Sequence, residues 1–241
     1  MKQSNRPATP QDLFTKIAPW YDIVNSIASC RRDRRWREFS LSGVSTKELV
    51  NVIDVACGTG AMATAINQLL PNARIIGVDL NSSMLDIAER RQGRRYERLI
   101  QGSADSLPCE SNYFHIATMA FAFHDLTEPA SALSEIFRVL LPGGQLVCLE
   151  LSLPSNQRYR RRYVKFLRTL VAIRNWLGLA SEGHVIDEIL ASPSQSYLEN
   201  IARAAGFEVI SRREHSYGIV TSYHLRRPID DLEEEEVLSG E

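Results

Sequence analysis

Two glycines and three acidic residues have the types and the spacing of a nucleoside-binding site. Gly58 and Gly60 follow the apolar run that contains Asp54. Glycines at this position let the backbone turn sharply, so that main-chain N–H groups at a helix start can approach a ligand. Asp79 comes 25 residues after Asp54 and could accept hydrogen bonds from both ribose hydroxyls. Asp105 is placed to receive an adenine amino group.

Each of these features also has a purely structural interpretation. An acid alone suits a helix N-cap or a solvated turn, and Gly-x-Gly alone occurs in tight turns between a strand and a helix. Three acids in this order favour a ligand site, because open parallel sheets bind ligands at the carboxyl ends of their strands. The third glycine of the dinucleotide fingerprint is missing near Thr64, which disfavours a pyrophosphate ligand.

Apolar runs alternate with helical periodicity through most of the chain. The patterns predict strands at 50–56, 74–80, 97–101, 114–120 and 145–151, and helices at 62–70, 82–95 and 129–140. Nearly continuous apolar strands between helices are typical of a parallel sheet covered on both faces, so we expect a doubly wound α/β fold. A helix at 195–205 and strands at 206–212 and 218–225 follow, and the last two strands would pair antiparallel.

The remaining segments define the predicted domain organisation. Residues 1–45 would form an N-terminal helical lid, and residues 46–228 the main domain, with a helical insertion at about 155–195 that contains a long helix at 157–179. Residues 229–241 would be a disordered acidic tail.

Composition excludes several classes of protein. The 241 residues carry 28 basic and 29 acidic side chains, with 44% hydrophobic residues, which excludes collagen, bulk disorder and a small disulfide scaffold. The four cysteines lie far apart, so we expect no metal or redox site and a reduced cytoplasmic setting. The polar N-terminus and the lack of a run of about 18 apolar residues predict neither a secretory signal nor a membrane span.

A set of motifs between residues 50 and 150 resembles the class I S-adenosylmethionine-dependent methyltransferases. The motifs are Asp54-x-x-x-Gly58-Thr-Gly60, Asp79, Asp105, the segment from Phe114 to Ala122, and Leu141-Pro-Gly-Gly-Gln-Leu. The resemblance implies S-adenosylmethionine as cofactor and a mostly parallel seven-stranded, Rossmann-like sheet whose last strand is inserted antiparallel.

A narrower resemblance covers almost the whole chain. Phe14-x-x-Ile-Ala-x-x-Tyr-Asp-x-x-Asn25, Arg34-Arg-Trp-Arg37, Asn81-x-Ser-Met-Leu85, Ala104-Asp-Ser-Leu-Pro108, Phe121-x-x-x-Asp-Leu-Thr127 and Glu150-x-Ser-x-Pro154 are similar to the ubiquinone/menaquinone-biosynthesis C-methyltransferases. That family methylates a ring carbon of a polyprenylated quinol. Carried over by position, the resemblance implies that Thr59, Asp79, Ser103 and Ala104 contact the cofactor. Together with the residues of the motifs above, we predict a cofactor-binding set of Asp54, Gly58, Thr59, Gly60, Asp79, Leu80, Met84, Ser103, Ala104, Asp105 and Phe121.

The chain departs from the family pattern around the expected acceptor pocket. His124-Asp125 replaces the usual Arg-Asn, Ala56-Cys57 replaces Gly-Gly, and the segment 183–190 differs from the family's Tyr-x-x-Leu-x-x-Ser. The identity of the acceptor therefore stays open. The alternatives are a polyprenyl quinol, another small molecule methylated on oxygen or nitrogen, and a methyltransferase-like subunit that binds without catalysis.

Two pairs of neighbouring residues are candidates for the chemistry at the acceptor. His124, with Asp125 beside it, could act as the general base that deprotonates a quinol hydroxyl, or it could only pack at the pocket rim. Tyr21, with Asp22, could close over the cofactor as part of the lid, or it could form a corner where helices dock.

The long predicted helix has an unusual charge. Residues 155–181 contain seven basic residues and no acid. This helix could lie on an anionic membrane surface, where polyprenyl substrates reside, or it could be a solvated face over the pocket. Nucleic-acid binding is disfavoured, because there is no recognised RNA-binding signature and the acidic tail would repel phosphate. The sequence leaves the oligomeric state open.

Overall fold

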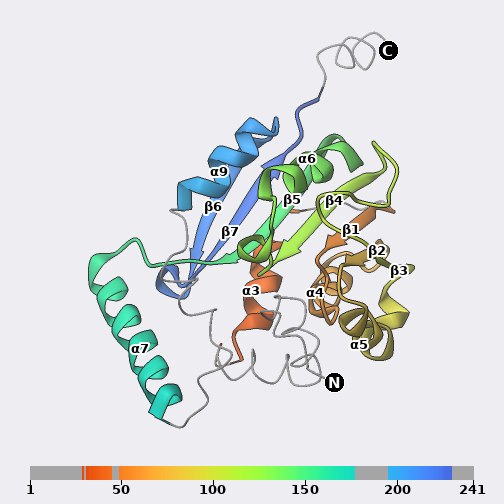
Figure 1. The fold of residues 1–241 in the computed structure, drawn as a ribbon. Coiled ribbons are helices and arrows are strands. Elements are labelled where there is room, and N and C mark those ends of the chain that lie inside the picture. The colour runs from red at the N-terminus through yellow and green to blue at the C-terminus, as the bar shows by residue number, and fades with distance from the viewer. Residues whose placement is uncertain (1–28, 30, 45–48, 177–194, 230–241) are drawn as a thin grey trace, which may run out of the picture.

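Segments of four to twelve residues, most of them apolar, form the strands of a single sheet. The computed structural model describes residues 29, 31–44, 49–176 and 195–229. Within these residues the sheet has seven strands in the order β3-β2-β1-β4-β5-β7-β6 (Figure 1). The strands are β1 (Asn51–Val55), β2 (Arg74–Asp79), β3 (Arg98–Gln101), β4 (Phe114–Ala120), β5 (Leu140–Leu151), β6 (Glu208–His215) and β7 (Val220–Arg226).

The first five strands are parallel, and β7 runs antiparallel between β5 and β6. The connections between the parallel strands contain α4 (Ala61–Leu69), α5 (Ser82–Gln92) and α6 (Pro129–Val139), while α3 (Asp33–Ser40), α7 (Gln157–Trp176) and α9 (Gln195–Ala204) complete the helices described. The predicted doubly wound fold, with its antiparallel last strand, is confirmed.

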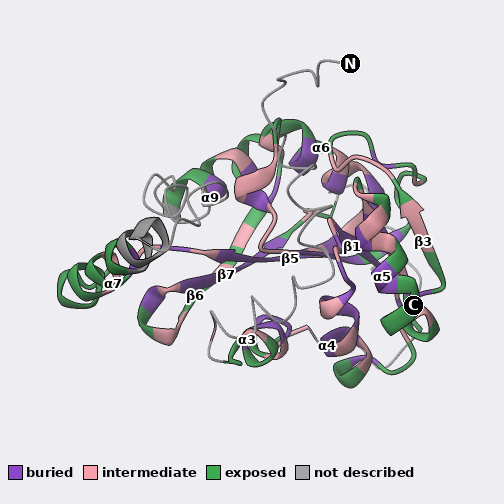
Figure 2. Ribbon diagram, turned by 60° about the horizontal axis from the view of Figure 1, so that its bottom comes forward, coloured by how far each residue is buried: buried purple, intermediate pink, exposed green. Residues whose placement is uncertain are grey.

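Helices cover both faces of the sheet (Figure 2). One core cluster joins β1, β4 and β5 to α6 and α9, and includes Ile53, Ile136 and Leu198. A second cluster joins the opposite face to α4 and includes Val52 and Ile66. Burying an aliphatic side chain of this size stabilises the fold by about 1.5 to 3 kcal/mol. The resulting rigid sheet holds its strand ends at fixed spacing.

The largest difference from the predicted elements is the start of β5, at Leu140 rather than residue 145. Pro142-Gly143-Gly144 was expected to separate a helix from a strand. The structure instead contains an irregularity in the ladder, in which Phe114 pairs with Leu140 and Ile116 with Gln145. Gly144 is required there, because a Cβ would come within 2.7 Å of the Leu141 carbonyl oxygen. The residues Pro142-Gly143-Gly144 thus form a bulge within the β4–β5 ladder and not a separate turn.

Smaller differences occur at other element ends. The helix expected over 82–95 ends at Gln92 and continues as a 3₁₀ turn over Gly93–Arg95. The two final strands extend further than expected, β6 to His215 and β7 to Arg226.

The helix α7 begins six residues after β5 ends, and it stands apart from the helices that cover the sheet (Figure 1). The predicted end of this helix at 177–179, the rest of the insertion, most of the expected lid and the acidic tail from residue 230 lie outside the described residues. None of the described helices combines the length and the apolar character needed to cross a bilayer.

Candidate functional site

A cavity opens at the carboxyl ends of β1, β2, β3 and β4. Nine of the predicted site residues line it, namely Gly58, Asp79, Leu80, Met84, Ser103, Ala104, Asp105, Phe121 and Asp125. The structure therefore brings together residues from four separate strand ends. Sequence reasoning did not select the other lining residues, which are Ala56, Asn81, Gly102, Ala120, Ala122, Leu126, Thr127, Glu128 and Ala132.

Asp79 is held in place by two backbone N–H groups. Gly58 N donates to Asp79 Oδ2 at 2.7 Å, and Asn81 N donates to Oδ1 at 2.8 Å. Burial raises the pKa of this carboxyl group, while the two N–H groups act in the opposite direction. The group is thus a fixed acceptor in the cavity wall, as binding of ribose hydroxyls requires.

The turn after β1 leaves space for a ligand. Gly58 has φ +55°, and a Cβ added to it would meet no atom within 4 Å. Gly58 also lines the cavity, so the turn is open next to it. Gly60, also with positive φ, caps the N-terminus of α4 instead of lining the cavity. Thr59 is buried beside it and does not line the cavity either.

The start of α5 forms the neighbouring wall. Asn81 Oδ1 accepts hydrogen bonds from Ser83 N and Met84 N, so Asn81 is the N-cap. This cap fixes the buried Met84 and the exposed Leu80 next to the loop that carries Asp105. Apolar side chains beside a carboxylate suit a flat base with an exocyclic amino group.

Asp54 lies behind the cavity and does not line it. It is 1% exposed, and its carboxylate accepts hydrogen bonds from Tyr96 Oη and Thr118 Oγ1, both at 2.8 Å. Burial raises the pKa of Asp54 to about 6. Sequence reasoning assigned Asp54 to direct cofactor contact and did not identify Tyr96 or Thr118. The geometry shows that Asp54, through these hydrogen bonds, links β1 to β4 and to the segment after α5.

His124 also lies behind the cavity wall, whereas Asp125 lines it. Nδ1 of His124 is 2.8 Å from Glu150 Oε1, and its Nε2 is 3.5 Å from Asp125 Oδ2. Glu150 also accepts hydrogen bonds from the N–H groups of Phe123 and Leu151. Because both Glu150 oxygens accept from N–H donors, we assign the ring proton of neutral His124 to Nδ1. The nitrogen Nε2, without a proton, then faces Asp125.

This arrangement places an imidazole between two carboxylates, with one carboxylate in the cavity wall. Sequence reasoning did not identify Glu150 as a partner of His124, although an acid inside the apolar run of β5 was an available signal. Tyr21 and Asp22 lie outside the described residues.

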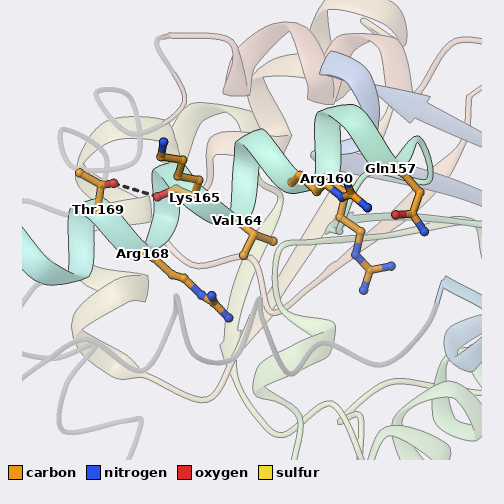
Figure 3. A pocket seen from close by; sticks show the side chains of 7 residues that line it. Gln157, Arg160, Val164, Lys165, Arg168 and Thr169 are labelled. Atoms are coloured by element: carbon orange, nitrogen blue, oxygen red, sulfur yellow. Dashed lines mark hydrogen bonds between the residues drawn. The ribbon is translucent and has the colours of Figure 1, made fainter.

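A second hollow follows one side of α7, where Arg160, Lys165 and Arg168 point away from the helix axis (Figure 3). The described residues that line it all belong to α7, being Gln157, Arg160, Arg161, Val164, Lys165, Arg168 and Thr169. The hollow is thus basic and separate from the strand ends. In the described part of the chain, no group of three or more His, Cys, Asp or Glu side chains is placed to hold a metal ion.

The residues at the strand ends fit an adenosyl ligand. The open space at Gly58, the fixed carboxylate of Asp79 and the Met84 wall provide room, an acceptor for the ribose and an apolar surface. These are the groups that the cofactor predicted from the sequence requires.

Comparison with known proteins supports this interpretation. The ubiE/COQ5 methyltransferase family matches residues 2–226. The "Ubiquinone/menaquinone biosynthesis C-methyltransferase UbiE" of Geobacter sulfurreducens is 34% identical over 223 residues, which are 88% of this chain and 86% of the relative. The "Demethylmenaquinone methyltransferase" of Paenarthrobacter aurescens is 32% identical over 231 residues, or 95% and 90% of the two chains.

The fold agrees with these relatives. The crystal structure of an S-adenosylmethionine-dependent methyltransferase from Aquifex aeolicus superposes with a TM-score of 0.59 at 19% identity, over 79% of this chain and 89% of that one. The chain therefore belongs to the ubiE/COQ5 methyltransferase family and is an S-adenosylmethionine-dependent methyltransferase.

Proposed function

We propose that the enzyme methylates a ring carbon of a polyprenyl quinol or a related aromatic lipid. The observation that carries the proposal is Asp125 in the cavity wall with His124 and Glu150 behind it, a set of groups able to accept a hydroxyl proton. The quinone-biosynthesis names of the relatives support the same acceptor class.

When bound, S-adenosylmethionine supplies a methyl group on a positively charged sulfur. The protein's own residues orient the reactants and move a proton. Asp79 holds the ribose side, and this alignment provides much of the acceleration. Asp125 accepts the proton of the quinol hydroxyl, which increases the electron density at the neighbouring ring carbon. His124 Nε2 then receives this proton from Asp125, and Glu150 stabilises the resulting imidazolium. The ring carbon that takes the methyl group then loses its own hydrogen as a proton, which restores the aromatic ring, and the oxygen regains the proton held at His124. One proton in total therefore leaves the acceptor for each methyl group added.

Incubation with methyl-labelled S-adenosylmethionine and a demethylated polyprenyl quinol tests the proposal. We expect label on a ring carbon of the quinol, identified by mass spectrometry and NMR of the product. Label on an oxygen or nitrogen atom, or no labelled quinol, would overturn it.

One specific observation favours a second candidate function. His124-Asp125 stands where the related family has Arg-Asn, so the acceptor could be another small molecule methylated on oxygen or nitrogen. The labelled product from a cell extract separates the two candidates. No labelled product from the extract would overturn both candidate acceptors.

We also propose that α7 brings the enzyme to an anionic membrane surface on the cytoplasmic side, where a polyprenyl acceptor would reside. Six basic residues lie between Arg158 and Arg168, and none forms an ion pair with another described residue. Phe166 is 55% exposed among them. Exposed cations next to an exposed aromatic ring are typical of interfacial helices.

A further inference from the structure

Arg37 is a buried cation next to the wall of the cofactor cavity. It belongs to α3 and is 8% exposed. Its guanidinium carbon lies 5.1 Å from the ring centroid of Phe121, which lines the cavity at the end of β4. Since α3 precedes β1 in the chain, this contact brings an N-terminal residue to the strand-end edge of the sheet.

The charge of Arg37 is only partly compensated. Nη1 contacts Asp33 Oδ2 at 3.2 Å, but the side chain of Asp33 is 27% exposed. Nε is buried and has no hydrogen-bond partner among the described residues. Asp54 is close enough for Arg37 to lower its pKa, although burial has the larger, opposite effect. The carboxylate of Asp54 accepts its side-chain hydrogen bonds from Tyr96 and Thr118.

A buried guanidinium with an unsatisfied N–H group is costly unless an anion completes its surroundings. Arginine is also the side chain best suited to a carboxylate, because its N–H groups form a planar fork. A carboxylate is the only anionic group of S-adenosylmethionine, and it is at the opposite end from adenine.

The order of the strands indicates where this end of the cofactor would lie. Asp79 ends β2 and Asp105 follows β3, whereas Phe121 follows β4, on the other side of β1. A ligand with its adenosyl group near β2 and β3 and the rest across the Gly58 turn therefore extends toward Phe121 and Arg37.

We propose that Arg37 binds the carboxylate of the methionine moiety of S-adenosylmethionine. The inference rests on the identity of the cofactor and is independent of the methyl acceptor. It also gives a role to a buried charge that the fold by itself leaves partly unpaired.

Isothermal titration with two ligands tests this role without an acceptor or turnover. S-adenosylmethionine and decarboxylated S-adenosylmethionine are titrated into the wild type and Arg37→Met. We expect the variant to bind S-adenosylmethionine about 10- to 100-fold more weakly, the usual range for a hydrogen bond to a charged group. Its affinity for the decarboxylated ligand should be unchanged.

Arg34→Met is the matched control. Arg34 lies on the same helix, and its side chain is exposed and pairs with Glu38. Its loss also removes one positive charge, but both affinities should equal those of the wild type. A weakening of S-adenosylmethionine binding of the same size in this control would show a long-range charge effect and would overturn the proposal.

The stability of the ligand-free protein separates binding from packing. Removing Arg37 takes one partner from the partly exposed Asp33, whose Oδ1 still accepts a hydrogen bond from Ser29 Oγ, so Arg37→Met should melt at the wild-type temperature or above. If Arg37→Met does not fold, Arg37→Lys replaces it in the titration and should still weaken only the carboxylate ligand. Equal weakening of both ligands, or no weakening of either, would overturn the proposal.

Discussion

Asp54 has both carboxylate oxygens engaged by hydroxyl groups and is 1% exposed. Its pKa is raised to about 6, because burial disfavours the charged form. An acid with a raised pKa in the folded state retains a proton that the unfolded chain has already released. Its contribution to stability therefore falls as the pH rises from about 4 to 6 and stays constant above that range.

We expect Asp54→Asn to remove this decrease in stability with pH, because an amide does not titrate. Relative to the wild type, the free energy of unfolding of the variant should increase by up to about 3 kcal/mol across the same pH range. Urea unfolding at several pH values measures the difference. Asp86→Asn, which changes an exposed residue of α5, serves as control and should follow the wild-type curve. If Asp54→Asn also follows the wild-type curve, the assigned shift is wrong.

His124 and Glu150 form a second side-chain unit, in which Glu150 acts through the imidazole. His124→Ala should lower the methylation rate at saturating cofactor by about 100-fold or more, the usual size of a general-base effect. The dissociation constant of S-adenosylmethionine should hardly change. Glu150→Gln should also lower the rate, and adding it to His124→Ala should have little further effect, because the two residues serve one step.

Nitrogen NMR of the histidine rings gives an independent measurement. We expect His124 to carry its proton on Nδ1, because Nδ1 faces Glu150. His115 is an internal reference with the opposite tautomer, since its Nδ1 accepts a hydrogen bond from Asn51 N. Two results would show that Glu150 only stabilises the fold. One is a neutral His124 ring with its proton on Nε2. The other is a double variant whose loss of rate is the product of the two single losses.

At the scale of elements, the turn between β1 and α4 determines how closely a ligand approaches the backbone. Gly58 lines the cavity with φ +55°, and Gly43 has φ +107° in a different loop. Neither position has an atom within 4 Å of an added Cβ. Both glycines thus have a backbone conformation that favours glycine, but only Gly58 lines the cavity.

Gly58→Ala and Gly43→Ala should both lower the free energy of unfolding, by about 1 kcal/mol each. Only Gly58→Ala should weaken cofactor binding, by about tenfold or more, because its methyl group enters the cavity. Chemical denaturation and titration calorimetry measure the two effects. Unchanged cofactor affinity in Gly58→Ala would mean that the ligand does not approach this turn.

At the scale of the whole molecule, the summed charge of −1 conceals a strongly basic helix. We expect the enzyme to cosediment with phosphatidylcholine vesicles that contain phosphatidylglycerol, and only weakly with pure phosphatidylcholine. Each basic residue near such a surface contributes about 1 kcal/mol, and salt screens this attraction. Replacing Arg160, Arg161 and Lys165 with Glu should therefore release the protein from the vesicles.

Replacing Arg90, Arg94 and Arg98 with Glu provides a control with the same charge change. These residues are exposed at the β3 edge of the sheet, far in the strand order from the strands next to α7. This variant should keep most of its vesicle binding. Equal loss in both variants would show that net charge matters and that α7 is not a specific contact.

The sequence alone determined the succession of strands and helices along the chain, the doubly wound class and the edge of the sheet that carries the candidate site. These features follow from local properties, because apolar periodicity and turn residues act over a few neighbouring positions. The structure corrected the start of β5, where Pro142-Gly143-Gly144 is held in a bulge by pairing with β4.

Only the tertiary structure decided which polar side chains face the cavity and which lie behind it. Asp54 meets Tyr96 from 42 residues away, and His124 meets Glu150 from 26 residues away. Arg37 likewise reaches Phe121 through the packing of α3. Residues in a strand alternate between the two faces of the sheet, so a strand-end acid can point into the core or toward a ligand. The direction of such a side chain depends on the strands and helices that pack beside it. These elements are distant in the sequence, so the local sequence does not predict the direction.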